Sequence, residues 1–168
     1  YPTEGVVEYD GQNIHQGKDA VLSAFRRRRI GFIFQKFHLI PVLTARENII
    51  MPLLLDHRQV DEGYFKQITQ FLGLEHRLTH LPSELSGGQQ QRVAIARALI
   101  AKPDVIFADE PTGNLDSQSG REVMDLLASV HREFGKTIVV ITHDDRIAQM
   151  AERKFSIVDG ILSEVSRR

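Results

Sequence analysis

The chain has 168 residues, of which 42% are hydrophobic and 26% are charged, a composition that fits a globular domain and excludes an intrinsically disordered chain. The formal net charge of −1 excludes a general electrostatic attraction to nucleic acid, although one basic run, residues 26–29, is expected to form a solvated face. The absence of cysteine excludes disulfides, and no apolar run approaches the roughly 20 residues of a membrane-spanning helix, so a membrane role is expected only through a partner.

The first quarter of the chain alternates between strand and helix signals. Residues 5–9 are strand-like, and Asp10-Gly11 is a hairpin turn signal. A short helix is predicted over residues 19–29. It is followed by an apolar run, residues 30–34, that has the length of a buried strand.

The middle of the chain is predicted to be mainly helical. Thr44 and Glu47 have the spacing of a capping box ahead of an apolar segment. Further helices are predicted over residues 61–72 and from Ser86 onwards. The whole stretch 44–101 contains no strong strand signal.

The last third of the chain returns to an alternation of strands and helices. Strands are predicted at residues 105–108 and 137–141, with a helix over 117–134 between them. A short helix is expected over 144–152, followed by a hairpin over 155–162. Strands that alternate with helices imply right-handed crossovers and a parallel α/β sheet.

The strand at 105–108 ends in two adjacent carboxylates, Asp109 and Glu110. In open α/β sheets, ligands bind at the carboxyl ends of the strands. An aspartate at this place can hold Mg²⁺, directly or through water, and a second carboxylate can take a proton from an attacking water. A strand that simply ends at a polar loop would look the same, so the motif alone leaves both interpretations open.

A second motif, Leu-Ser-Gly-Gly-Gln at residues 85–89, opens a predicted helix. Two glycines allow a backbone to approach a ligand closely. The start of a helix offers free N–H groups and a partial positive charge, which suit a phosphate. The alternative is a flexible glycine turn in which Ser86 merely caps the helix.

Five motifs occur in the order and with the spacing found in ABC ATPases. Residues 85–89 resemble the signature motif of that family, and residues 106–110 resemble its Walker B strand. Gln35 matches the Q-loop glutamine, residues 114–117 match the D-loop, and His143 matches the switch histidine. Five ordered motifs are far more specific than any single one.

Longer stretches narrow the resemblance to the ATPases of lipoprotein-release, macrolide-export and antimicrobial-peptide transport systems; these stretches are residues 31–35, 39–41, 43–48 and 109–117. The resemblance covers essentially the whole chain. It implies an α/β fold with a partial P-loop NTPase core and a parallel sheet, formed by residues 1–43 and 102–168. Residues 44–101 would form a mainly helical signature subdomain.

The resemblance also implies ATP and Mg²⁺ as ligands and a role for each motif residue. Glu110 would be the general base, and His143 would hold the γ-phosphate and link it to Glu110. Gln35 would sense both Mg²⁺ and the attacking water. Asp109 would support Mg²⁺, and Asp116 would connect the two sites of a dimer.

The expected partners are a second ATPase subunit, in a head-to-tail dimer, and an integral membrane permease. In that dimer Ser86, Gly87, Gly88 and Gln89 would complete the ATP site of the partner subunit. The permease would hold the protein at the cytoplasmic face of the cell membrane. No nucleic-acid partner is expected.

One departure from the family is that the sequence contains no Walker A loop of the form G-x-x-x-x-G-K-[ST]. In the family that loop lies just upstream of the segment matching residues 1–5, so we expect a truncation at the N-terminus and no activity from the chain alone. The strand at 137–141 would then lack one neighbour. The alternatives are a non-hydrolysing regulatory module and an ABC ATPase of DNA repair. The latter is disfavoured because only a compact stretch separates Gln35 from Ser86.

Overall fold

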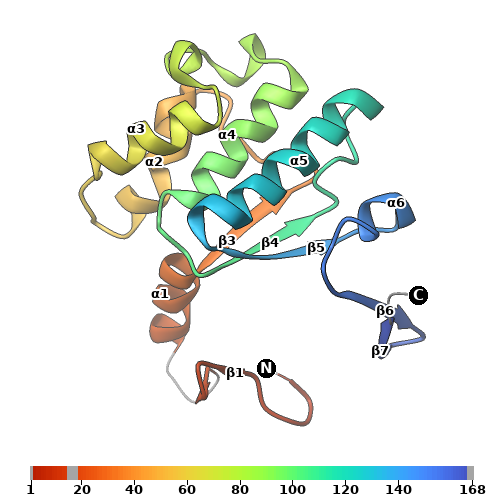
Figure 1. The fold of residues 1–168 in the computed structure, drawn as a ribbon. Helices are drawn as coiled ribbons and strands as arrows, with labels where there is room; N and C mark the ends of the chain where they lie inside the picture. The colour runs from red at the N-terminus through yellow and green to blue at the C-terminus, as the bar shows by residue number, and fades with distance from the viewer. Residues whose placement is uncertain (1, 15–18, 166–168) are drawn as a thin grey trace.

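A three-stranded parallel sheet forms the centre of the protein in a computed structural model, which describes residues 2–14 and 19–165 (Figure 1). The strands, in their order across the sheet, are β3 (Ile30–Phe34), β4 (Val105–Asp109) and β5 (Thr137–Ile141). Their register aligns the last residues, so that Phe34 lies opposite Asp109 and Asp109 lies opposite Ile141. The loops that follow the three strands therefore begin at one edge of the sheet.

The helices in the described part of the chain are α1 (Asp19–Arg29), α2 (Ala45–Leu55), α3 (Glu62–Phe71), α4 (Gly87–Leu99), α5 (Ser117–Phe134) and α6 (Asp145–Ala148), with short 3₁₀ turns η1 (Glu75–Arg77) and η2 (Pro82–Glu84). Two of them, α4 and α5, lie on one face of the sheet. Helix α4 packs against β3 and α5 against β5, while α2 and α3 pack on α4 (Figure 1). None of the helices in the described part of the chain combines the length and the apolar character that crossing a membrane requires.

Local capping explains where the main helices begin and end. Thr44 and Glu47 form the predicted capping box at the start of α2. Asp61 caps α3, and Asp116 caps α5. Helix α5 ends at Gly135, whose φ of 61° is the left-handed conformation that glycine adopts without strain.

The hydrophobic core lies between the helices and the covered face of the sheet. Ile33 and Ile106 on the strands are fully buried, as are Ile95 on α4 and Ile49 on α2. These residues belong to one continuous cluster, which crosses the predicted boundary between the stretch 44–101 and the rest of the chain. The division into two subdomains stays a prediction.

The opposite face of the sheet is open in the described part of the chain. The apolar runs at 30–34 and 137–141 have the pattern of buried strands, yet Phe32 is 41% exposed, Val139 39% and Ile141 54%. Successive side chains of a strand point to opposite faces, so helices on one face leave alternate residues uncovered. Among the described residues, β5 is paired with β4 alone.

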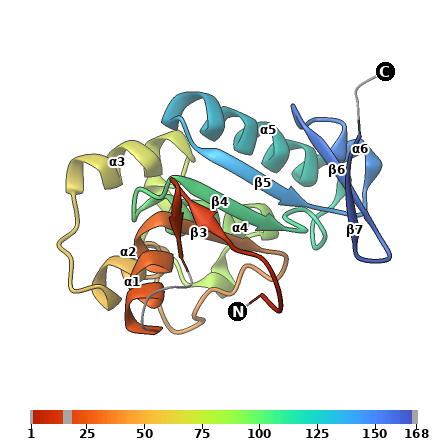
Figure 2. The same ribbon diagram turned by 90° about the horizontal axis from the view of Figure 1, so that it is seen from below.

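Two small hairpins lie outside the central sheet. The first joins β1 (Glu8–Tyr9) to β2 (Gln12–Asn13) through the predicted Asp10-Gly11 turn. The second joins β6 (Lys154–Val158) to β7 (Ile161–Val165) and lies on the side of α6, away from α1 (Figure 2). Helix α6 is shorter than predicted.

The basic run at the end of α1 forms ion pairs rather than a purely solvated face. The Arg28 Nε atom lies 2.7 Å from Asp56 Oδ2, and Arg29 Nη1 lies 3.1 Å from Asp104 Oδ2. The Arg28 side chain, as the main cause, lowers the pKa of the Asp56 carboxyl. Because the arginines remain largely exposed, solvent screens these pairs and their contribution to stability is small.

Candidate functional site

The register of the sheet brings three of the predicted site residues to one edge. Gln35 follows the end of β3, Glu110 follows the end of β4, and His143 lies two residues beyond β5. Since the final residues of these strands are aligned, the three side chains leave the sheet at the same level. This edge is the carboxyl end of a parallel sheet, where ligands of open α/β folds bind.

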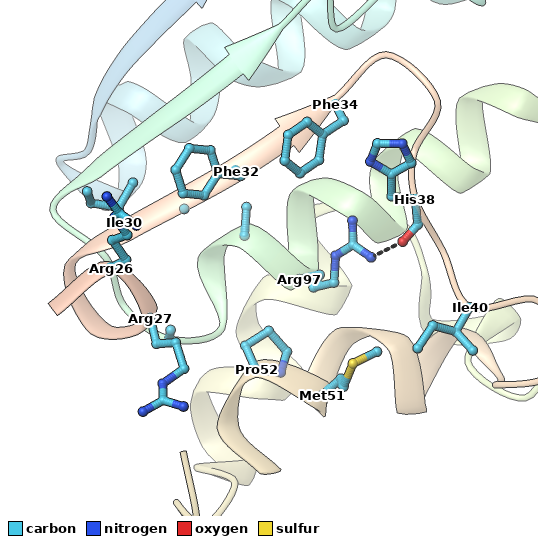
Figure 3. Close-up of a pocket in the computed structure, with 13 residues that line it drawn as sticks. Arg26, Arg27, Ile30, Phe32, Phe34, His38, Ile40, Met51, Pro52 and Arg97 are labelled. Atoms are coloured by element: carbon cyan, nitrogen blue, oxygen red, sulfur yellow. Dashed lines mark hydrogen bonds between the residues drawn. The ribbon is translucent and has the colours of Figure 1, made fainter. Parts of the chain in front are cut away.

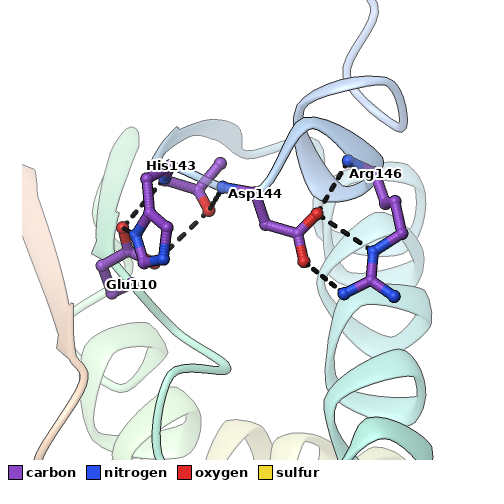
Figure 4. A network of polar contacts seen from close by, with 5 residues as sticks. Glu110, His143, Asp144 and Arg146 are labelled. Carbon is purple, nitrogen blue, oxygen red and sulfur yellow. Dashed lines mark hydrogen bonds and ion pairs between the residues drawn. The ribbon is translucent and has the colours of Figure 1, made fainter.

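The Glu110 carboxylate is held by the segment that follows β5 (Figure 4). Its Oε1 atom accepts from the His143 backbone N–H at 2.9 Å and lies 2.6 Å from His143 Nδ1. Its Oε2 atom accepts from the Thr142 hydroxyl at 3.3 Å. Because a carboxylate only accepts, this contact requires a proton on Nδ1 and leaves Nε2 of His143 available to a ligand.

The two partners differ in their exposure to solvent. The His143 side chain is 89% exposed, whereas the Glu110 side chain is 21% exposed. The carboxylate is thus partly shielded from water, which strengthens its hydrogen bonds. The imidazole ring projects outward from the edge of the sheet.

The backbone of Glu110 adopts an unusual conformation. Its φ of 44° is left-handed, a region that costs a residue with a side chain on the order of 1–3 kcal/mol. The Glu110 N–H donates to the Ile141 carbonyl at 2.9 Å, which ties the turn to the end of β5. Strained backbone of this kind is concentrated at functional sites.

Gln35 is joined to the loop that follows Glu110. The Asn114 side-chain amide donates to the Gln35 carbonyl at 3.0 Å, and Gln35 Nε2 donates to Asn114 Oδ1 at 3.5 Å. Gly113 lies so close that a Cβ atom at its position would be 2.5 Å from Gln35 Nε2. The absence of a side chain at Gly113 therefore leaves space for the amide of Gln35.

Asp109 lies exposed on the open face of the sheet, next to Glu110. Within residues 2–14 and 19–165, no three histidine, aspartate or glutamate side chains gather into a metal site. Mg²⁺ is commonly held by one or two carboxylates together with substrate phosphates rather than by a cage of protein ligands. A single carboxylate at the end of β4 fits that mode of binding.

The signature segment has a local hydrogen-bond pattern. Ser86 is the N-cap of α4, and its Oγ atom accepts from the Gln89 N–H at 3.3 Å while Gln89 Oε1 accepts from the Ser86 N–H at 3.0 Å. Ser86 therefore caps the helix, which is compatible with both interpretations of the motif. A Cβ atom at Gly87 would lie 3.1 Å from Leu115 Cδ2, whereas at Gly88 its nearest neighbour would be Ser119 at 3.9 Å. Only Gly87 is tightly packed.

Asp116 has a structural role at the start of α5. Its carboxylate accepts from the N–H groups of Gln118 and Ser119, both at 3.0 Å, and from the Ser119 hydroxyl at 2.6 Å. The Ser119 hydroxyl, as the main cause, lowers the pKa of Asp116. Since Ser119 also borders Gly88, the starts of α4 and α5 lie close together.

A groove of about 490 Å³ lies between α1, β3, α2 and α4 (Figure 3). Its wall is mainly apolar and includes Phe32, Phe34, Ile40, Met51 and Pro52, with the cations Arg26, Arg27 and Arg97 at its border. Arg97 donates to the carbonyls of His38 at 2.5 Å and Phe37 at 2.7 Å. It thus holds the segment that follows Gln35.

Sequence reasoning missed one residue of the site and the contacts of another. Thr142 was not singled out, and Asn114 was named only as part of a motif. The available signal was position, because Thr142 is the first polar residue after an apolar strand and precedes His143. Their partners are 32 and 79 residues away, and no local pattern reveals such pairs.

Comparison with known proteins gives consistent matches. A family profile described as "ABC transporter" matches residues 1–113. The lipoprotein-releasing system ATP-binding protein LolD of Geobacter metallireducens is 47% identical over 161 residues, which cover 95% of this chain and 72% of the relative. An uncharacterized ABC transporter ATP-binding protein of Methanocaldococcus jannaschii is 47% identical over 168 residues, covering 98% of this chain and 74% of the relative.

A solved structure has the same fold. The ATP-binding cassette MJ0796, in a dimeric post-hydrolysis state bound to ADP and Pi, superposes with a TM-score of 0.81 at 43% identity. The match covers 99% of this chain and 76% of that one. It extends over the central sheet and the helices described above.

Proposed function

The chain belongs to the ABC transporter family and is an ATP-binding subunit, whose relatives hydrolyse ATP to power transport. We propose that Glu110 is the general base of this hydrolysis reaction. The observation that carries this proposal is the fixed orientation of the Glu110 carboxylate, bonded by His143 and Thr142 at the carboxyl end of the sheet. A general base needs such a defined position within reach of the proton it removes.

In the proposed reaction Glu110 takes a proton from a water molecule as the water oxygen attacks the γ-phosphorus of ATP. The bond from that phosphorus to the bridging oxygen breaks, and ADP and phosphate are the products. His143, with a proton on both ring nitrogens, would donate its outward Nε2–H to the γ-phosphate, and Gln35 would orient the water. Asp109 would hold Mg²⁺, which neutralises developing charge on the phosphates when it is bound.

We further propose that a second subunit completes the site. The related cassette MJ0796 is dimeric. The start of α4, with Ser86, Gly87, Gly88 and Gln89, would close over the ATP of the partner subunit, where free N–H groups and the helix dipole favour an anion. Asp116, near this helix start, would join the two sites.

The membrane partner that we propose is a permease, which would hold the protein at the cytoplasmic face of the membrane. The mainly apolar groove between α2 and β3 is a suitable contact surface, with Arg26 and Arg27 at its border to meet a carboxylate of the permease. Met51→Glu should prevent copurification of the permease. Arg121→Glu, on the distant surface of α5, is the matched control. Equal copurification of both variants would contradict the assignment of the groove.

The test of the base uses a subunit that carries a Walker A loop upstream of these 168 residues, called the intact subunit below. Light scattering should show that ATP, and not ADP, converts the intact subunit to dimers. These dimers should decay in the wild type as ATP is consumed and persist in Glu110→Gln. Decay at the same rate in both would remove Glu110 from the role. Dimers that form without any hydrolysis in the wild type would favour the regulatory-module alternative.

A further inference from the structure

The Thr142 hydroxyl lies between the carboxylate of Glu110 and the backbone of Asp144 (Figure 4). Resting on the proposed role of Glu110, we propose that Thr142 is a positioning residue for ATP hydrolysis. Its hydroxyl fixes Oε2 of Glu110 and selects that oxygen as the one that receives the proton of the attacking water.

The direction of the hydroxyl proton follows from its two partners. Thr142 Oγ1 accepts from the Asp144 N–H at 3.1 Å and lies 3.3 Å from Glu110 Oε2. A hydroxyl has a single proton, and the Asp144 N–H already occupies a lone pair of the oxygen. The proton is therefore free to point to Glu110. The distance of 3.3 Å is long for an O–H···O bond, and such bonds often shorten when substrate binds.

Counting acceptor positions shows why this bond matters for the reaction. An ionised carboxylate offers about four acceptor positions, two on each oxygen. On Glu110, Oε1 receives the two N–H groups of His143, and Oε2 receives Thr142. One position remains, on Oε2, and it is the place where a water proton would be accepted. Without Thr142 the carboxylate could turn about its last bond, which has a broad rotational preference.

The loop that carries Thr142 is itself held firmly. Asp144 caps α6 by accepting from the Arg146 N–H at 2.8 Å, and its carboxylate pairs with the Arg146 guanidinium at 3.1 and 2.7 Å (Figure 4). At the other end, the Ile141 carbonyl accepts from the Glu110 N–H at 2.9 Å. These bonds restrict the backbone on both sides of Thr142, so the position from which its side chain extends is fixed.

The test compares Thr142→Val, which removes the hydroxyl and keeps the shape, with Thr142→Ser, which keeps the hydroxyl. In the intact subunit, Thr142→Val should lower kcat about 10- to 100-fold, the range expected for losing a hydrogen bond to a charged group. The KM for ATP should change by less than about 2-fold, because the lost interaction serves the transition state. Thr142→Ser should retain most of kcat.

A double variant separates this inference from the proposed function. If Thr142 acts through Glu110, adding Thr142→Val to Glu110→Gln should lower kcat no further. Normal hydrolysis by Glu110→Gln would overturn the proposed function itself. A large loss in Glu110→Gln together with wild-type kcat in Thr142→Val would overturn only the role of Thr142.

Melting temperatures distinguish a loss of kcat from a loss of folding stability in the Thr142 variants. Thr142→Ala serves as a second deletion variant in case Thr142→Val folds poorly. A loss of kcat shared by both deletions at an unchanged melting temperature, and absent in Thr142→Ser, supports the proposal. A loss that follows the fall in melting temperature, or that is equal in Thr142→Ser, would overturn it.

Discussion

Glu110 and Ser86 obtain their hydrogen-bond partners from different distances along the chain. The carboxylate of Glu110 is bonded by Thr142 and His143, which are 32 and 33 residues away. The hydroxyl of Ser86 is bonded by Gln89, three residues away in its own helix. The first cluster therefore exists only when β4 and β5 are aligned, whereas the second forms wherever α4 forms.

This difference has a consequence for function. The Glu110 cluster is completed by one chain, so changes in it should lower turnover without weakening association of subunits. The signature segment is the start of α4, where Ser86 and Gln89 bond to each other. Changes in it should weaken association while the fold and the Glu110 cluster remain intact.

The largest effect is expected from Glu110→Gln in the intact subunit. Glutamine keeps the size of the side chain but cannot take a proton at neutral pH, so turnover should fall by about 10²–10⁴-fold. Binding of Mg-ATP, measured by titration calorimetry, should be nearly unchanged. The separation of the two clusters would fail if this variant also lost ATP-dependent dimerisation.

Gly88→Asp should weaken the ATP-bound dimer by at least about 10-fold, because like charges at an interface cost several kcal/mol. The fold should remain, since a Cβ atom at Gly88 would meet only Ser119 at 3.9 Å and an acidic residue suits a helix start. Sizing experiments with ATP measure the dimer, and Gly88→Ala is the control for the added carbon. Full dimer formation by Gly88→Asp would place the partner's phosphate elsewhere.

A smaller effect is expected from Ser86→Ala, which removes the cap of α4. The free energy of unfolding should fall by about 1 kcal/mol, as measured by urea titration. Ser86→Asn should restore that stability, because asparagine is an equally good cap. If Asn also restores dimerisation, the cap rather than a contact to the partner explains the requirement for Ser86.

The smallest effect concerns Asp144, which anchors the Glu110 cluster. The Arg146 side chain, as the main cause, lowers the pKa of Asp144 to about 2, from an ordinary value of about 3.9. A carboxyl with a lowered pKa stabilises the fold above its ordinary pKa, and this contribution is lost as the pH falls from about 4 to about 2.

As the pH is lowered from about 5 to about 2, a range that spans the ordinary and the lowered pKa of Asp144, the melting temperature should therefore fall less steeply for Asp144→Asn than for the wild type. Arg146→Ala should flatten the same curve, because it removes the main partner of Asp144. Parallel curves for all three proteins would show that the pair does not affect stability.

Local signals predicted most of the elements and many of their ends. The helices at 19–29 and 117–134 and the strands at 30–34 and 137–141 have the predicted bounds. A capping box at Thr44 explains such accuracy, because it involves residues only three apart. Burial was predicted less well. The apolar run at 137–141 carries no information about which of its faces a helix covers.

The sequence by itself determined the family, the order of the motifs and the residue types of the candidate site, since each of these is written in short contiguous stretches. The tertiary structure decided which groups touch. It aligned the ends of β3, β4 and β5, turned Glu110 into a left-handed conformation and brought Thr142 and His143 to its carboxylate. The physical reason is that hydrogen bonds within a helix or turn depend on neighbours in the chain. The pairing of distant strands depends on the packing of the whole core.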